Sequence, residues 1–336
     1  MSENYLNLVE SVISFYDVGK LITANFEEIQ DRENNLILKF ETNMGTYLLK
    51  CYSDIKNKGK TEDLKQRLSY AAGLLIQDQI PIPLCLTKKK APYLEFNGEL
   101  FSIDRFIEGT TFKEKRDDES LILVANLLGK LHSSTRIEIK KPLKTHEFVK
   151  TKNTLRIFES FEKIKEENSK ESLEVLSYEK IILSELSDLE RAIKKLKPKK
   201  KISLIHGSYA ERQIMINDIN MAYLIDYETM EQNFSEYEFS NALLLFSKGD
   251  NFKFDLDLAN LFIKSYKNEF GEEFEINVDE ILTLIRHSLL NTFSGILRTY
   301  SKTFRPELNQ GPLNFFFNKL KWLRENENLV REKLII

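Results

Sequence analysis

The apolar residues change their spacing about a third of the way along this chain of 336 residues. Up to about residue 107 they fall in short runs rich in β-branched and aromatic side chains, which are typical of strands. From residue 117 they recur at helical spacing, as at Leu121, Val124, Ala125, Leu128 and Leu131. The pattern predicts an α+β protein with two lobes: residues 1–107 hold a small antiparallel sheet and a helix, and residues 108–336 are mainly helical.

Two β-hairpins are predicted within the first lobe. Residues 35–52 form two β-favouring runs on either side of Asn43-Met44-Gly45, which suits a tight turn. A second pair of runs, residues 93–96 and 100–106, flanks Asn97-Gly98. This dipeptide is the strongest short-range signal for a two-residue hairpin turn, because both of its positions tolerate a positive φ.

Helices are predicted around these hairpins and over most of the second lobe. An amphipathic helix covers residues 3–16, and another covers residues 60–78. The second helix ends before Ile80-Pro-Ile-Pro83, because proline disfavours helical geometry in the residue that precedes it. Residues 145–197 and 252–336 are also helical in pattern, and the apolar blocks of the latter are typical of a core.

The composition excludes several classes of function. A formal net charge of −3 provides no general positive field for nucleic acid, and no apolar run is long enough to span a membrane. The two cysteines, Cys51 and Cys85, suggest neither a disulfide framework nor a zinc site, and no signal peptide is recognisable. We therefore expect a soluble cytoplasmic protein without nucleic-acid partners.

Nucleotide-binding glycine motifs are absent, since the glycines are scattered singly and form neither GxGxxG nor GxxxxGK[ST]. A lysine-rich run, residues 194–201, has two possible interpretations. It can be an anion-binding patch or, as is more common for such runs, a solvated helix end with its loop.

Polar residues interrupt the apolar sequence between residues 202 and 228. A loop beginning with His206 and Gly207 lies between short apolar runs, and Asp226 follows the last of these runs. Polar side chains held by short strands are well placed to position a metal ion and phosphates. An ordinary hairpin with a capping histidine would have the same spacing, so the residues alone leave both interpretations open.

This stretch resembles the catalytic loop and metal-binding strand of the aminoglycoside phosphotransferase and choline kinase group. The resemblance is carried by His206-Gly207-x(5)-Gln213 and by Asp226 in Ile225-Asp-Tyr-Glu228. Four further segments resemble, in order, the family's lysine strand, proline turn, inter-lobe linker and first large-lobe helix: Thr46–Tyr52, Gln79–Pro83, Ile103–Gly109 and Leu128–His132. The resemblance covers most of the chain and implies a bilobal protein kinase-like fold.

The resemblance also implies a nucleotide site in the first lobe. Lys50 matches the family's nucleotide-binding lysine, and Asp104 lies in the linker segment that contributes to the same site. The helix over residues 60–78 has no obvious glutamate to pair with Lys50: Gln66 is near the expected place and Glu62 lies about a turn early. The implied cofactors are ATP and Mg²⁺.

The catalytic loop departs from the family pattern His-Gly-Asp-x-x-x-x-Asn. Ser208 stands at the position of the aspartate base. A neutral hydroxyl cannot replace that base, so the rate of phosphate transfer should fall by a factor of about 10²–10⁴. Gln213, with Asp226 an implied metal ligand, moves its amide oxygen by one methylene relative to asparagine. His206 is retained as a catalytic-loop residue. Glu211 is either a displaced base or a solvent-exposed glutamate.

Two functions follow from this combination. The first is a pseudokinase or nucleotide-binding assembly protein with a degenerate site, which would need no cofactor if its role were purely structural. Thr87–Gly98 resembles the bacterial spore-coat branch of the family, which implies coat or other assembly proteins as partners and a spore-coat location after cytoplasmic synthesis. The second is an active ATP- and Mg²⁺-dependent phosphotransferase that uses a non-standard base on a small-molecule hydroxyl acceptor.

Overall fold

The computed structural model describes residues 2–22, 27–30, 36–52, 61–143, 153–167, 169–249 and 253–336. The chain divides into two compact units. The first unit comprises Met1–Thr135 and Leu204–Gln232, and the second comprises Arg136–Ser203 and Asn233–Ile336. The predicted boundary between residues 107 and 108 stays a prediction. All eight candidate site residues belong to the first unit.

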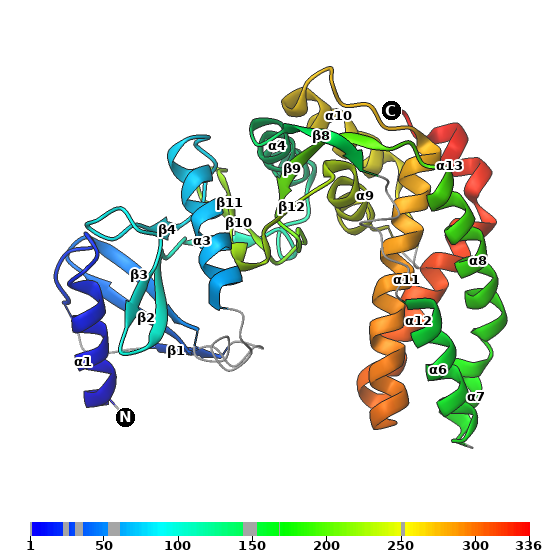
Figure 1. Cartoon of the computed structure of the whole chain (residues 1–336), viewed down its shortest axis with the longest axis horizontal. Helices are drawn as coiled ribbons and strands as arrows, with labels where there is room; N and C mark the ends of the chain where they lie inside the picture. The colour runs from blue at the N-terminus through cyan, green and yellow to red at the C-terminus, as the bar shows by residue number, and fades with distance from the viewer. Residues whose placement is uncertain are drawn as a thin grey trace. The chain divides into compact units, whose positions relative to one another are not determined.

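The first unit contains a six-stranded antiparallel sheet (Figure 1). Its strand order is β1-β2-β3-β6-β4, and β5 pairs with β6 outside this path. The bounds are Glu27–Gln30 for β1, Leu36–Thr42 for β2, Gly45–Cys51 for β3, Leu84–Cys85 for β4, Leu94–Phe96 for β5 and Glu99–Arg105 for β6. The small sheet agrees with the predicted α+β class.

Both predicted hairpins are confirmed. β2 and β3 pair with Thr42 opposite Gly45, although Asn35, at the start of the predicted run, lies outside the described residues. β5 and β6 pair with Phe96 opposite Glu99, which leaves Asn97 and Gly98 as a two-residue turn. Their φ angles are 51° and 78°, and the type I′ turn requires positive values at both positions.

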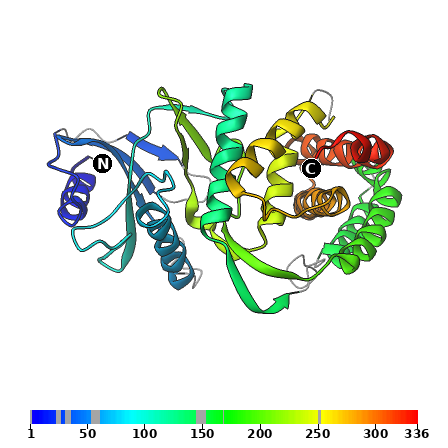
Figure 2. The ribbon, with the colours of Figure 1, turned by 90° about the horizontal axis from the view of Figure 1, so that it is seen from above.

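Two helices lie on either side of this sheet in Figures 1 and 2. The helix α1 (Ser2–Ile13) packs Val9 and Val12 into a core with Leu38, Phe40 and other sheet residues. The helix α3 (Thr61–Ile76) buries the apolar stripe Leu64, Leu68, Ala71, Ala72 and Leu74. It ends close to the predicted residue.

Gln79 begins the proline turn, three residues after the end of α3. Gln79 has φ 52°, in the left-handed region that favours glycine. Lys130 donates a hydrogen bond to the Gln79 carbonyl at 3.2 Å.

The remainder of the first unit carries the predicted catalytic loop. A second sheet has the order β11-β10-β7, and α4 and the 3₁₀ helix η1 complete the unit. The bounds are Gly109–Thr111 for β7, Asp118–Ser134 for α4, Ile214–Asn217 for β10, Ala222–Leu224 for β11 and Tyr227–Thr229 for η1. The Tyr209 hydroxyl donates to the Val124 carbonyl of α4 at 2.6 Å, which anchors the loop before β10.

The second unit is mainly helical (Figure 2). Its helices are α6 (Asn153–Lys165), α7 (Lys170–Leu176), α8 (Glu179–Lys195), α9 (Ser235–Phe246), α10 (Leu256–Phe270), α11 (Val278–Thr303), α12 (Pro306–Glu325) and α13 (Glu327–Lys333). The long α11 packs against α6, α8, α9 and α12. β8 (Ile137–Leu143) pairs antiparallel with β9 (Lys199–Ile205), and the boundary between the units passes through β9 and β12 (Glu231–Asn233).

The lysine-rich run is only partly a solvated helix end. Lys194, Lys195 and Lys200 are exposed, as that interpretation predicts. Lys199 instead lies between two buried carboxylates, with Nζ 3.1 Å from Glu236 and 2.5 Å from Glu280. The run therefore contributes an internal ion cluster to the second unit. In the described part of the chain, no helix is long and apolar enough to cross a membrane.

Candidate functional site

Lys50 of β3 is the centre of a cluster of carboxylates in the first unit. Its Nζ lies 2.9 Å from Glu228, 3.4 Å from Asp104 and 3.6 Å from Asp226. The side chain is only 8% exposed. Burial by itself disfavours the ammonium, but Glu228 and Asp104 more than offset it and raise the pKa of Lys50 well above its ordinary value. Lys50 is therefore a fixed positive charge.

Strand pairing explains how Asp104 reaches the lysine. In the β3–β6 ladder Lys50 faces Ser102 and Leu48 faces Asp104, so both charged side chains share one face of the sheet. Asp104 is buried, and it accepts a hydrogen bond from the Tyr227 hydroxyl. Burial raises the pKa of Asp104, although Lys50 opposes this effect.

The other two carboxylates near Lys50 belong to Asp226, whose backbone is left-handed, and to Glu228. Asp226, directly before η1, has φ 57° and ψ 41°, a conformation that costs a non-glycine residue free energy and is common at functional sites. Glu228 follows two residues later and accepts a hydrogen bond from the Tyr52 hydroxyl at 2.9 Å. Burial favours its neutral form, but the Lys50 ammonium outweighs this and lowers the pKa of Glu228.

Helix α3 is connected to this cluster through the main chain. Arg67 Nη1 donates to the carbonyl oxygen of Glu228 at 2.8 Å. Gln66, a candidate nucleotide-site residue near the position expected for a partner of Lys50, is exposed, and its amide donates to the Tyr70 hydroxyl at 2.7 Å. Glu228, not a residue of the helix, therefore provides the close carboxylate partner of Lys50.

The predicted catalytic loop packs on the segment that carries Asp226. The ring Nε2 of His206 lies 2.8 Å from the Ile225 carbonyl oxygen, and the Thr229 hydroxyl donates to the His206 carbonyl at 2.7 Å. Gly207 has φ 79°, and a Cβ there would lie 2.4 Å from the Thr229 carbonyl oxygen. His206 is buried and acts here as a positioning residue.

The two predicted metal ligands lie on neighbouring segments. Ile225 N donates to the Gln213 carbonyl at 3.0 Å, which brings the backbone of Gln213 next to the residue before Asp226. Asp226, with a 54% exposed side chain, and the amide of Gln213 are hard oxygen donors of the kind that Mg²⁺ prefers. The described residues contain no ready-made group of three or more His, Cys, Asp or Glu ligands. Mg²⁺ commonly takes few protein ligands and completes its shell with water and phosphate.

Ser208 and Glu211 do not form an evident base. Ser208 is half-buried, and its hydroxyl makes no hydrogen bond within the described residues. Glu211 is half-buried and ion-paired with Arg116, so it is neither the solvent-exposed residue that one interpretation predicted nor an unengaged carboxylate. The catalytic roles of these residues stay predictions.

Glu228, Tyr52 and Arg67 were missed by the sequence reasoning as partners in the cluster. The two carboxylates at alternate positions in Asp226-Tyr-Glu228 were the available signal. Tyr52, two residues after Lys50 and directly after the end of β3, was another. Arg67 gave no signal, because its partner is a main-chain carbonyl.

Comparison with known proteins identifies the architecture. No family model matches the sequence, and no curated protein matches it. Solved structures do match it across nearly its whole length. An aminoglycoside phosphotransferase from Alicyclobacillus acidocaldarius has a TM-score of 0.66 at 12% identity, covering 95% of both chains. The chain therefore has a kinase-like fold.

Two further structures support this kinase-like fold. A spectinomycin phosphotransferase in complex with ADP and spectinomycin has a TM-score of 0.63 at 14% identity, covering 94% of this chain and 93% of the other. A choline kinase from Streptococcus pneumoniae has a TM-score of 0.57 at 16% identity, covering 96% of this chain and 99% of the other. The predicted bilobal kinase-like class is thereby confirmed.

Proposed function

We propose that this protein binds ATP with Mg²⁺ in the first unit and transfers phosphate very slowly or not at all. The observation that carries the proposal is the cluster at Lys50, where Glu228, Asp104 and Asp226 surround a fixed ammonium. The matching structure with ADP adds support for a nucleotide ligand. Ser208, at the position of the base, argues against efficient transfer.

The residues of the cluster have distinct roles in this proposal. Lys50 binds phosphate oxygens, and Glu228 and Asp104 hold its ammonium in place. Asp226 and Gln213 bind Mg²⁺, which neutralises charge on the phosphates when it is bound. The excess of carboxylates over ammonium groups, three against one, favours a divalent cation there.

The missing base sets the expected rate. Kinases typically turn over at roughly 1–100 s⁻¹. Removing a general base lowers the rate by a factor of about 10²–10⁴. A turnover number of roughly 10⁻⁴ to 1 s⁻¹, centred on the order of 10⁻² s⁻¹, follows. Such a rate suits a binding or regulatory role better than metabolism.

Calorimetry with AMP-PNP and Mg²⁺ tests nucleotide binding. Wild type should bind, Asp226→Ala should bind at least about tenfold more weakly after losing a charged ligand, and Asp218→Ala should match wild type. Asp218 is a suitable control because it is exposed in the turn between β10 and β11. Equal heats for wild type and Asp226→Ala would contradict the proposal.

Restoring the family's carboxylate tests the low rate. Ser208→Asp should raise the rate of ADP release in an acceptor screen by up to about 10²- to 10³-fold, because the new carboxylate supplies a base. The active alternative makes a different prediction: wild type turns over at an ordinary rate, and Glu211→Gln abolishes turnover while nucleotide affinity is kept. The Arg116–Glu211 ion pair weighs against that alternative, because the carboxylate is already engaged.

A second proposal concerns assembly. The resemblance of Thr87–Gly98 to the spore-coat branch supports coat proteins as partners. Within the protein Thr87 also has a local role, since its hydroxyl accepts a hydrogen bond from Ala91 N at 3.0 Å. A fluorescent fusion in a spore-forming host tests the location: enrichment at the spore surface supports the proposal, and diffuse fluorescence contradicts it.

A further inference from the structure

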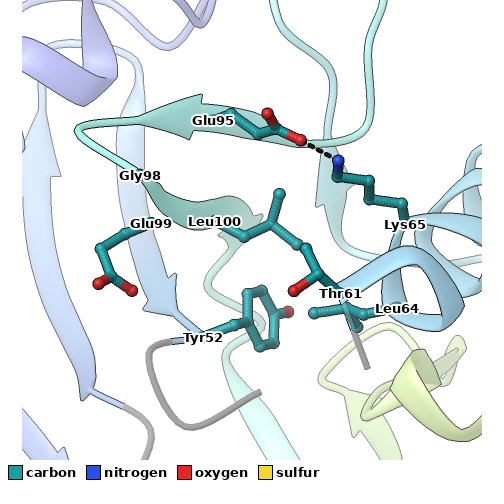
Figure 3. A pocket seen from close by; sticks show the side chains of 8 residues that line it. All are labelled: Tyr52, Thr61, Leu64, Lys65, Glu95, Gly98, Glu99 and Leu100. Carbon is teal, nitrogen blue, oxygen red and sulfur yellow. Dashed lines mark ion pairs between the residues drawn. The ribbon is translucent and has the colours of Figure 1, made fainter. Parts of the chain in front are cut away.

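A small cavity lies between α3 and the β5–β6 hairpin of the first unit (Figure 3). Its volume is about 180 Å³. Leu64, Leu100 and the ring of Tyr52 supply apolar walls, and Figure 3 shows them facing one another. None of the residues assigned above to nucleotide or metal binding lines it. The cavity is therefore a second site, which shares only Tyr52 with the partners described for the Lys50 cluster.

The described residues that line the cavity include more acidic side chains than basic ones. Lys65 is ion-paired with Glu95, as the dashed line in Figure 3 marks, and its Nζ also lies 2.9 Å from Glu62. Its charge is thus already matched by two carboxylates. Glu99 lies across the cavity from Lys65 in Figure 3, and its Oε2 is buried without a hydrogen-bond partner in the described part of the chain.

An unpartnered buried carboxylate oxygen favours a ligand that brings a donor. Leaving such an oxygen unsatisfied costs free energy, and a charged donor recovers more of that cost than a neutral one. The size of the site limits the rest of the ligand, since an apolar cavity of about 150 Å³ holds one benzene ring. The ligand should therefore combine one ring-sized apolar body with one cationic donor.

We propose that this cavity binds a small primary amine, with its ammonium on Glu99 and its apolar body against Leu64, Leu100 and the ring of Tyr52. A chain of contacts connects the site to the nucleotide cluster. Tyr52 presents its ring to the cavity, while its hydroxyl donates to Glu228 at 2.9 Å and shares a hydrogen bond with Ser102 at 3.0 Å.

Helix α3 provides a second connection. Leu64 and Lys65 of this helix line the cavity, and Arg67, on the next part of the same helix, holds the Glu228 carbonyl. A bound amine stabilises the arrangement in which both Tyr52 and Arg67 fix Glu228 beside Lys50, so it should tighten nucleotide binding. This coupling rests on the proposed nucleotide function, whereas the amine site does not.

Titration calorimetry of the full chain with benzylamine tests the site. Benzylamine should bind, and benzyl alcohol, which has the same ring without the charge, should bind at least about tenfold more weakly. Glu99→Gln should weaken benzylamine by a similar factor, and Glu41→Gln, an exposed glutamate of β2, should leave it unchanged. Because Glu99 Oε2 has no hydrogen-bond partner to lose in the described part of the chain, Glu99→Gln should not unfold the protein. Absent binding, or equal affinity for wild type and Glu99→Gln, would overturn the amine site.

Tyr52→Phe separates binding from coupling. The variant keeps the ring that lines the cavity, so its benzylamine affinity should match that of wild type. In wild type, saturating benzylamine should lower the Kd for AMP-PNP by about fivefold or more, and in Tyr52→Phe this effect should largely disappear. If benzylamine leaves the Kd of wild type for AMP-PNP unchanged, the coupling is contradicted. Failure of AMP-PNP to bind at all would refute the proposed function and this coupling, while the benzylamine titration still decides the amine site.

Discussion

Lys50 of β3 and Glu228 of η1 are 178 positions apart in the chain, and their charged groups lie 2.9 Å from each other. Glu228 also accepts a hydrogen bond from Tyr52, and its carbonyl accepts one from Arg67 of α3. The helix is therefore connected to the lysine through Glu228 and not through a glutamate of its own. Glu62, the glutamate of α3, is instead ion-paired with Lys65 of the same helix.

Glu228→Gln should lower the free energy of unfolding by about 1–3 kcal/mol, because it weakens a charge-assisted pair to a buried lysine. Urea unfolding followed by circular dichroism measures this. Glu41→Gln, exposed on β2, should stay within about 0.5 kcal/mol of wild type. Similar effects for both variants would mean that the Lys50–Glu228 pair contributes nothing to stability.

The stability due to Glu228 should depend on pH in a defined direction. Burial opposes ionisation, but Lys50 holds the pKa of Glu228 below its usual range, so the folded chain binds fewer protons there than the unfolded chain. This stabilisation is complete above the unfolded pKa of about 4.3 and is lost as the pH falls through the folded pKa. The gap in unfolding free energy between wild type and Glu228→Gln should therefore shrink as the pH falls below about 4.3.

The contribution of Asp104 to stability should change with pH in the opposite direction. Burial raises its pKa, so the folded chain binds a proton at Asp104 more readily than the unfolded chain does. Wild type should therefore gain stability relative to Asp104→Asn as the pH falls through the folded pKa of Asp104. Urea titrations of both variants across the same pH series compare the two signs, and matching slopes would contradict the assignment.

Gly207→Ala should destabilise the protein by about 1–3 kcal/mol or more. The glycine has φ 79°, and a methyl group would meet the Thr229 carbonyl oxygen at 2.4 Å. Gly73→Ala is the matched control, since Gly73 lies within α3 and a Cβ there has nothing within 4 Å. It should stabilise the protein by about 0.5–1 kcal/mol. Thermal unfolding of both variants tests the contrast, and a harmless Gly207→Ala would show that the loop can move away from Thr229.

The thiol of Cys85 should react slowly in the folded protein. Burial, with the charge of Asp104, raises the pKa of Cys85 to about 12. At pH 8 the thiolate fraction is then about 10³ times smaller than for an unperturbed cysteine with pKa near 8.5. Reaction with Ellman's reagent should be slow in buffer and rapid in guanidinium, where both Cys51 and Cys85 become accessible. Rapid labelling of the native chain would contradict this.

Local features could be predicted well from the sequence. The Asn97-Gly98 turn was predictable because its two positive φ angles are a property of those residues themselves. The end of α3 was predictable because proline restricts its neighbour. The Asp226 segment was found as a candidate site because a polar residue after an apolar run is a local pattern.

The partners of the charged groups could not be predicted in the same way. The sequence suggested Gln66 for Lys50, yet the structure brings Glu228 there. It left Glu211 as a base or an exposed residue, and Arg116, almost a hundred residues earlier, pairs with it. An ion pair depends on where two distant segments meet, and no spacing rule reports that.

The sequence by itself determined the elements: the two hairpins, the helices, the kinase-like order of motifs and the presence of Ser208 in the predicted catalytic loop. Each of these depends on residues that are close together in the chain, where backbone preferences and apolar periodicity act directly. Only the tertiary structure decided that Glu228 holds Lys50 and that Tyr52 lies between this pair and a separate cavity. These contacts form when packing brings distant segments together, because burial and charge pairing depend on the whole unit and not on local sequence.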